Sequence, residues 1–214
     1  EYRPGAHTDL STVGIIKDAY PSDKTNHNGS NYAKFPTNIT IPTYFNDVEV
    51  KELCDVFLRN NDKVENIEIS STSIYLIGEY AFAECQKLNS INLPAITRIE
   101  NGTFTGCKAL TSIAFPDSVQ YIGDDAFFGC TGLTNVVISD NVTTLGQRAY
   151  YQCTNLTSVT IGNGVTKIDE MAFDGCTKLA TVSIGNSVKT IGNQAFARCS
   201  ALTNLNVPGT VKTI

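Results

Sequence analysis

The sequence predicts a stacked solenoid of parallel, in-register strands, on three observations. Cysteines recur at a nearly constant interval, at Cys85, Cys107, Cys130, Cys153, Cys176 and Cys199. Each cysteine is followed by Leu three residues on, apolar residues six and eight on, and Ala-Phe or a close variant before the next cysteine. Apolar and polar residues alternate in the run after each cysteine, which is typical of a half-buried strand. A unit this short cannot bury its own apolar face, so the copies are expected to stack.

The unit after Cys153 shows how each segment is expected to fold. The run from Leu156 to Ile161 alternates apolar and hydroxyl residues and predicts a strand. Gly162–Gly164 tolerates positive φ and predicts a turn, and Val165–Ile168 predicts a second short extended segment. The Ala-Phe pair that leads into Cys176 predicts a single helical or 3₁₀ turn.

Stacked copies place like residues one above another at about 4.8 Å per repeat. Two apolar columns are predicted on this basis. The leucine column contains Leu88, Leu110, Leu133, Leu156, Leu179 and Leu202, and the aromatic column contains Phe82, Phe104, Phe127, Tyr150, Phe173 and Phe196.

Two regions are expected. Residues 61–214 form the solenoid, with about seven units of which the last is incomplete. Residues 1–60 form a loop-rich segment and cap, with an early strand near 38–42 and an amphipathic helix near 47–59. The helix prediction depends on apolar residues at helical spacing and on Asn46 with Glu49, which resemble a capping box.

The two ends of the sequence suggest a piece of a longer protein. Residues 1–10 are polar and lack the apolar region of a signal peptide. Val211–Ile214 stops where Val188–Ile191 stands one repeat earlier, without a polar end cap. We therefore expect that the protein continues, or that a partner covers this end. End-to-end self-association through the uncapped C-terminal coil is a further expectation.

Composition and charge exclude several classes of partner. The net charge is −5, and no basic segment offers an electrostatic footing for nucleic acid or for an anionic membrane. No run approaches about 18 consecutive apolar residues, so direct insertion into a membrane is not expected.

The repeated cysteines are predicted to be buried structural thiols. Metal sites usually contain close pairs such as C-x-x-C, and this chain has none. Side chains stacked in parallel are badly oriented for the disulfide dihedral of about 90°. With Cys54 the cysteines number seven, which cannot pair completely.

Catalysis, metals and cofactors have little support, so the chain is expected not to be an enzyme. The only histidines, His7 and His27, lie in the irregular lead-in, far from any repeat cysteine. The acidic residues are expected to be solvated or to form turns. Asp117 and Asp140 fall in one column, but two carboxylates are few for calcium, which takes six or more oxygen ligands.

One unit contains, in order, Leu110, Ile113, Phe115-Pro116, Val119, Ile122-Gly123, Ala126-Phe127 and Cys130. This order resembles the BspA-like leucine-rich repeat family, whose unit runs L-x-x-I-x-L-P-x-x-V-x-x-I-G-x-x-A-F-x-x-C. The resemblance covers roughly residues 61–214, and Thr103, Tyr150 and Asp169 depart from it. It implies a right-handed leucine-rich repeat solenoid, strand-dominated within the α/β class. It also implies an extracellular or cell-surface protein, since some members are adhesins.

Two surfaces are candidates for partner binding. Tyr121, Phe128 and Tyr151 are expected to be outward-facing and to form a small aromatic patch. The alternative is the outward strand face, represented by Asn92, Ser112, Asn135, Thr160, Ser183 and Asn204. The function expected is a non-enzymatic, adhesion-type scaffold that binds a protein or glycan partner without a cofactor. The alternative is a structural spacer in a longer surface protein whose binding activity lies elsewhere.

Overall fold

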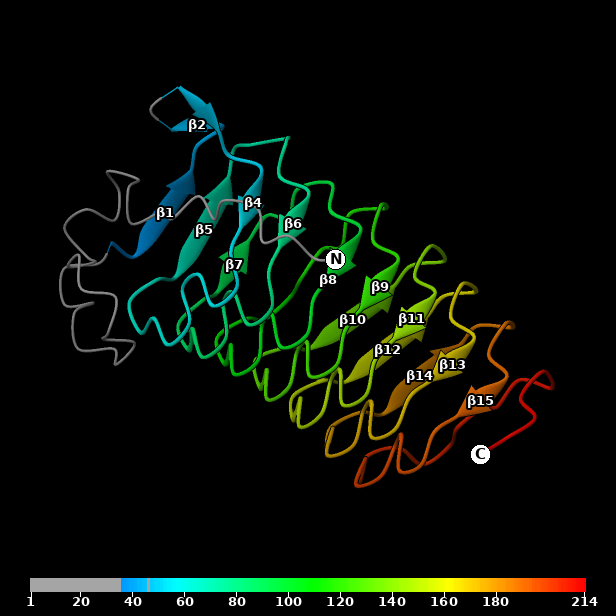
Figure 1. Cartoon of the computed structure of the whole chain (residues 1–214). Coiled ribbons are helices and arrows are strands. Elements are labelled where there is room, and N and C mark those ends of the chain that lie inside the picture. The colour runs from blue at the N-terminus through cyan, green and yellow to red at the C-terminus, as the bar shows by residue number, and fades with distance from the viewer. Residues whose placement is uncertain (1–35, 46) are drawn as a thin grey trace.

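The computed structural model describes residues 36–45 and 47–214, and every named element within them is a strand. The chain winds into a solenoid of stacked coils, from strand β1 to the C-terminal end drawn in red (Figure 1). Coils 1 to 7 are numbered here by their last residue: Asn61, Cys85, Cys107, Cys130, Cys153, Cys176 and Cys199. A partial coil, residues 200–214, follows. His7, His27 and nearly all of the expected lead-in lie outside the described residues.

The first wall of the solenoid is a pair of three-stranded parallel sheets. One sheet contains β1 (Asn38–Ile41), β5 (Asn66–Ile69) and β7 (Ser90–Ile91), and the other contains β10 (Asn135–Ile138), β12 (Ser158–Ile161) and β14 (Thr181–Ile184). In the second sheet Val136, Val159 and Val182 are direct partners, each one repeat after the last. The predicted parallel, in-register ladder is therefore confirmed.

The second wall follows the turn at the end of each first-wall strand. Its five-stranded parallel sheet contains β8 (Arg98–Ile99), β9 (Tyr121–Ile122), β11 (Thr144–Leu145), β13 (Lys167–Ile168) and β15 (Thr190–Ile191). Nearer the N-terminus, β4 (Glu52–Leu53) pairs in parallel with β6 (Leu76–Ile77). An antiparallel hairpin, β2 (Tyr44–Phe45) and β3 (Val48–Glu49), links β1 to β4.

The predicted helix over residues 47–59 is wrong. This segment contains β3, β4 and a turn. Elsewhere in the described part of the chain, too, there is no helix long and apolar enough to span a lipid bilayer. Leu53 pairs with Ile77 of the next coil and is fully buried in the solenoid core. The apolar spacing that looked helical is thus the spacing of an ordinary coil, because pairing with coil 2 satisfies the backbone better than an isolated helix of about three turns.

The segment that closes each coil is a run of turns and not the expected helical or 3₁₀ turn. In coil 2 the N–H groups of Tyr80 and Phe82 donate to carbonyls of the next coil, at 3.0 and 2.9 Å. A helix cannot form, because two residues per coil adopt positive φ. These pairs are Val56 and Asn60, Tyr80 and Glu84, Gly102 and Gly106, Asp125 and Gly129, Arg148 and Gln152, Met171 and Gly175, and Gln194 and Arg198.

The core consists of ladders of like side chains. In the aromatic column, successive rings from Phe82 to Phe196 stack with centroids 5.0–5.5 Å apart. Each repeat cysteine is buried and donates its S–H to a carbonyl of the preceding coil, at 3.0–3.2 Å. In coil 1 Asn61 takes the cysteine position, and its Oδ1 accepts from the N–H groups of Lys63 and Val64.

The first wall is interrupted at coil 4. Residues 111–116 form no strand, although they correspond to β10 of the next coil. Along this stretch, a single backbone hydrogen bond reaches a neighbouring coil, from the Thr134 N–H to the Thr111 carbonyl at 3.2 Å.

Two prolines weaken the ladder on either side of coil 3, next to this interruption. Pro94 and Pro116 occupy the position of Gly162, whose N–H donates to the preceding coil at 2.9 Å. Proline has no N–H to donate, so Pro94 removes this bond between coils 2 and 3, and Pro116 removes it between coils 3 and 4. Next to Pro94, the Asn92 side chain replaces backbone pairing: its Oδ1 accepts from the Ile69 N–H at 2.6 Å, and its Nδ2 donates to the Ile69 carbonyl at 3.0 Å.

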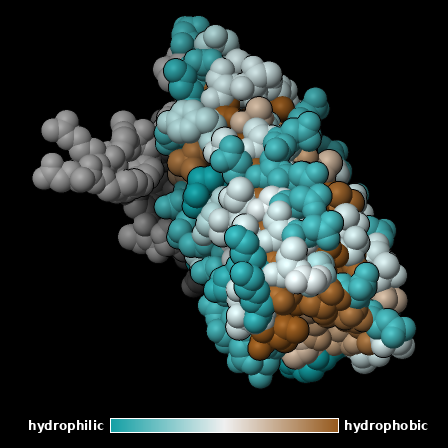
Figure 2. Space-filling model, turned by 90° about the vertical axis from the view of Figure 1, so that its right-hand side faces the viewer, coloured by the Kyte–Doolittle hydropathy of each residue, from teal (hydrophilic) through white to brown (hydrophobic). Residues whose placement is uncertain are grey.

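The C-terminal side of the solenoid exposes apolar surface. Figure 2 looks at this side and shows apolar atoms gathered in its lower part. Ile214 is 83% exposed. Several apolar residues at this end pack against the core but are only partly buried. They include Val182, Phe196, Leu202, Leu205, Val207 and Val211.

Candidate interaction surface

The outward face of the first wall presents two rows of side chains, at alternate positions along each strand. Strand pairing and the repeat assign every member, and all are exposed or half-buried. The first row contains Asn38, Asn66, Ser90, Ser112, Asn135, Ser158, Thr181 and Asn204. The second row contains Thr40, Glu68, Asn92, Ala114, Val137, Thr160, Ser183 and Asn206.

The six strand-face residues expected from the sequence fall into both rows. Ser112, Asn135 and Asn204 lie in the first row, whereas the second row contains Asn92, Thr160 and Ser183. The sequence reasoning missed the residues of coils 1 and 2 because the offsets between paired positions there are longer than the interval of the later coils.

Hydrogen bonds tie the first row together across coils. The Asn66 Nδ2 donates to the Asn38 Oδ1 at 2.7 Å, and the Ser90 hydroxyl donates to the Asn66 Oδ1 at 2.6 Å. In the second sheet the Ser158 hydroxyl donates to the Asn135 Oδ1 at 2.6 Å. These bonds hold the polar side chains in fixed positions before any partner arrives.

The face is almost uncharged. Glu68 is the one ionisable residue in the two rows. Val137, which is 65% exposed, adds an apolar spot near the middle of the solenoid. The surface is thus suited to hydrogen bonding with limited apolar contact, and not to charge recognition.

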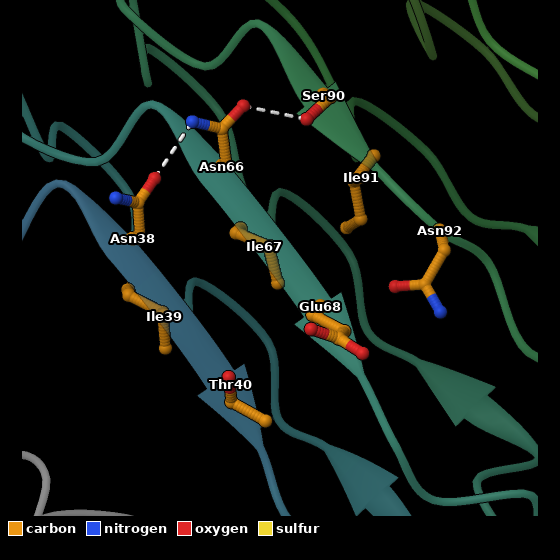
Figure 3. A pocket seen from close by; sticks show the side chains of 9 residues that line it. All are labelled: Asn38, Ile39, Thr40, Asn66, Ile67, Glu68, Ser90, Ile91 and Asn92. Carbon is orange, nitrogen blue, oxygen red and sulfur yellow. Dashed lines mark hydrogen bonds between the residues drawn. The ribbon is translucent and has the colours of Figure 1, made fainter.

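A hollow of about 640 Å³ lies over β1, β5 and β7. Figure 3 shows its three parallel lines of residues: Asn38, Asn66 and Ser90 along one rim, Thr40, Glu68 and Asn92 along the other, and Ile39, Ile67 and Ile91 between them. The volume lies within the range of small-molecule sites, although the hollow is open to solvent.

The predicted aromatic patch is brought together only in part. Phe128 and Tyr151 are half-buried and stack on each other, with centroids 5.0 Å apart and planes at 12°. The Arg198 guanidinium donates to the Tyr151 hydroxyl at 2.8 Å and to both oxygens of Asp174, a carboxylate that is 2% exposed. Part of this pair therefore belongs to a network that stabilises the turns.

Tyr121 lies apart from that pair, on strand β9 of the second wall. The Arg98 guanidinium lies 3.7 Å from its ring centroid, and its hydroxyl donates to the Asn101 Oδ1 at 3.3 Å. No ring contact joins it to Phe128 or Tyr151, which stack on each other alone. Burial raises the pKa of its hydroxyl, and the Asp124 carboxylate adds to this effect.

The repeat cysteines form no disulfide and are held as thiols. Burial raises the pKa of Cys85 to about 12 and that of Cys199 to about 11. Within the part of the chain that the structure describes, no three His, Cys, Asp or Glu side chains are grouped to hold a metal ion. Asp140, a calcium candidate in the sequence, accepts a hydrogen bond from the Asn163 N–H at 2.6 Å, which is the geometry of a turn former.

Comparison with known proteins identifies the family. The model of the BspA type leucine rich repeat region matches residues 51–114 and 97–214, in 6 copies. A leucine rich repeat protein of T. pallidum (TpLRR) is 29% identical, with 79% of each chain covered and a TM-score of 0.75.

Two further solved structures match with lower scores. A leucine-rich repeat protein from Bacteroides ovatus is 23% identical over 83% of this chain and 76% of its own, with a TM-score of 0.40. A leucine rich cell surface protein from Faecalibacterium prausnitzii is 22% identical over 82% and 70%, with a TM-score of 0.46. A comparison with the curated proteins found no match. The chain belongs to the BspA-type leucine-rich repeat family.

Proposed function

We propose that this chain is a non-enzymatic interaction scaffold, exposed at the cell surface or secreted, that binds a protein or glycan partner. Binding takes place on the outward face of the first wall. The observation that supports this proposal is the pair of polar, nearly uncharged rows, which run from coil 1 to the last coil. At about 4.8 Å per coil the rows extend roughly 30 Å between coils 1 and 7.

The architecture favours binding over chemistry. Convergent groups in the interior are used for packing: the thiols donate to backbone carbonyls and the aromatic rings stack. An open solenoid offers a long rigid surface instead of a closed pocket. The proposed location outside the cell is based on the resemblance to a family whose members include adhesins.

Phe128 and Tyr151 remain the second candidate surface. Their stacked ring edges are half-exposed, and Gly129 beside Phe128 leaves open space around its backbone. Aromatic residues dominate many binding hot spots. The pair therefore offers more contact energy per residue than the polar rows, on a much smaller area.

The proposal is tested on an array of extracellular-matrix proteins and glycans probed with purified residues 1–214. For a saturable hit, Thr160→Lys on the first wall is expected to weaken binding at least about tenfold, because it places a long charged side chain on the face. Thr144→Lys, a change at another exposed threonine, on β11 of the second wall, is the matched control. Loss of binding in Phe128→Ala with Thr160→Lys unaffected would transfer the site to the aromatic pair.

A structural spacer is the second candidate function, favoured by the continuous hydrogen-bonded stack. Backbone and thiol bonds join each coil to the next along the turn segments, and the five-stranded sheet joins coils 3 to 7 on the second wall. A folded chain that binds nothing on the array would support this alternative and contradict the scaffold.

A further inference from the structure

The hollow over β1, β5 and β7 has hydrogen-bonding capacity left over on both rims. Along the first rim, each bond runs toward Asn38: Ser90 donates to Asn66, and Asn66 donates to Asn38. The Asn38 amide N–H groups and the second N–H of Asn66 are therefore open as donors.

The opposite rim contributes acceptors. Among the described residues, no hydrogen bond or ion pair reaches the exposed Glu68 carboxylate, and the exposed Thr40 hydroxyl is equally unbonded. Asn92 is not available in the same way, because its side-chain amide is occupied by the backbone of Ile69. Donors on one rim thus face an acceptor and a hydroxyl on the other, across the backbone of Ile39 and Ile67 (Figure 3).

A ligand that fits this arrangement donates and accepts hydrogen bonds at short, regular intervals along its length. A sugar hydroxyl does both. The rim groups recur with the coil, at about 4.8 Å, and six-membered sugar rings in an extended glycan repeat at close to that distance. An extended peptide rises about 3.3 Å per residue, so its groups fall out of step with the coils.

The charge of the hollow selects among glycans. Glu68 is the one ionisable side chain that lines it, and the lining holds no cation. A carboxylate repels sulfated or uronic-acid sugars at close range. An uncharged glycan has no such penalty, and its hydroxyls can donate to the carboxylate, which gives stronger hydrogen bonds than a neutral acceptor.

We propose that this hollow binds an uncharged oligosaccharide, with about one sugar ring on each of β1, β5 and β7. The proposal deepens the scaffold function and depends on it. The rest of the outward face then serves for contacts with the remainder of the glycan or with the molecule that bears it.

The test measures binding of purified residues 1–214 to immobilised neutral oligomers of mannose, glucose, galactose and xylose, one to six units long. A heparin hexasaccharide is the anionic probe. We expect a saturable neutral hit whose affinity rises up to about three units and then levels off, since three strands line the hollow. Affinity is expected to change less than about twofold on raising NaCl to about 1 M, where the Debye length is about 3 Å.

Four variants and one control locate the site. Asn66→Ala and Glu68→Ala are each expected to weaken binding about tenfold or more, because each leaves sugar hydroxyls without a partner. Ser158→Ala and Thr160→Ala on β12 remove side chains from the same two rows outside the hollow, so they should weaken binding of the short oligomers less than Asn66→Ala and Glu68→Ala do. Thr144→Ala, an exposed change on β11 of the second wall, is the control that should leave the affinity unchanged. Circular dichroism of all five variants controls for folding.

The outcomes separate this inference from the scaffold function. Neutral glycan binding that the β12 variants abolish, and the hollow variants do not, would overturn the hollow but keep the scaffold. The same holds if only heparin binds, or if a protein hit maps to the first wall while no neutral glycan binds. A blank on every glycan and protein probe would overturn both.

Discussion

Replacing Tyr150 with phenylalanine is expected to stabilise the protein. Tyr150 is fully buried in the aromatic column, with parallel rings of Phe127 and Phe173 on its two faces at 5.0 and 5.4 Å. Its hydroxyl has no hydrogen-bond partner among the described residues, and burial raises its pKa well above the ordinary value. The other five members of the column are phenylalanines.

The size of the effect follows from the unmet hydrogen bond. A buried polar group without a partner costs about 1–3 kcal/mol. Removing the oxygen leaves a void of one atom, which costs a few tenths of a kcal/mol at about 24 cal/mol per Å³. The net gain is about 1–2 kcal/mol, or roughly 2–8 °C in Tm for a chain of this size.

Thermal and urea unfolding followed by circular dichroism measure this gain. Tyr151→Phe is the matched control, because it removes the same atom from a hydroxyl that accepts from Arg198 at 2.8 Å. That variant is expected to lower Tm. A fall in Tm for Tyr150→Phe comparable to that of Tyr151→Phe would mean that the buried hydroxyl is hydrogen-bonded, and the reasoning would fail.

Three further predictions follow from the coils. Burial raises the thiol pKa values, that of Cys85 from 9.0 to about 12. As the pH rises, the thiols therefore ionise in the unfolded chain before they ionise in the folded one. The stability contributed by the buried thiols is fully present below about pH 9 and is lost as the pH rises toward 12. Urea midpoints between neutral and alkaline pH measure this, and a flat profile would contradict it. Gly129→Ala imposes only backbone strain of about 1–2 kcal/mol, because nothing lies near the added methyl. At Gly102, also at positive φ, the added methyl meets the ring of Tyr80. Gly102→Ala should therefore have the lower Tm, and equal Tm values would count against the packing argument. Amide hydrogen exchange should be faster in residues 112–115 than in residues 135–138, since coil 4 lacks ladder bonds; equal protection would show that the first wall is continuous.

The regular part of the fold could be predicted because repetition fixes two things at once. The constant interval from Cys107 onward sets both the length of a coil and the register of its neighbours. Coils 1 and 2 depart from this interval, and the β2–β3 hairpin is inserted there. The apolar residues of 50–58 then fit a helix as well as a coil, and local spacing alone could not choose between them.

The closing turns and the hollow could not be predicted from the sequence, for two other reasons. Positive φ is easily predicted at Gly102 or Gly129, but Tyr80, Arg148 and Met171 adopt it too, without any local signal. The neighbouring coil holds them there through backbone hydrogen bonds. The hollow requires β1, β5 and β7 to lie side by side at irregular sequence offsets, which only the strand pairing reveals.

The interruption at coil 4 has a mechanical consequence. The strands run across the axis of the solenoid, so a force that pulls on its two ends loads the bonds between coils directly. On the first wall, coil 4 resists that force with one backbone bond, from Thr134 to Thr111, whereas β12 and β14 share a four-residue ladder. We expect the solenoid to yield there first and to bend about the second wall, which is intact at coil 4, so that a chain pulled at its two ends would lengthen before it unfolds.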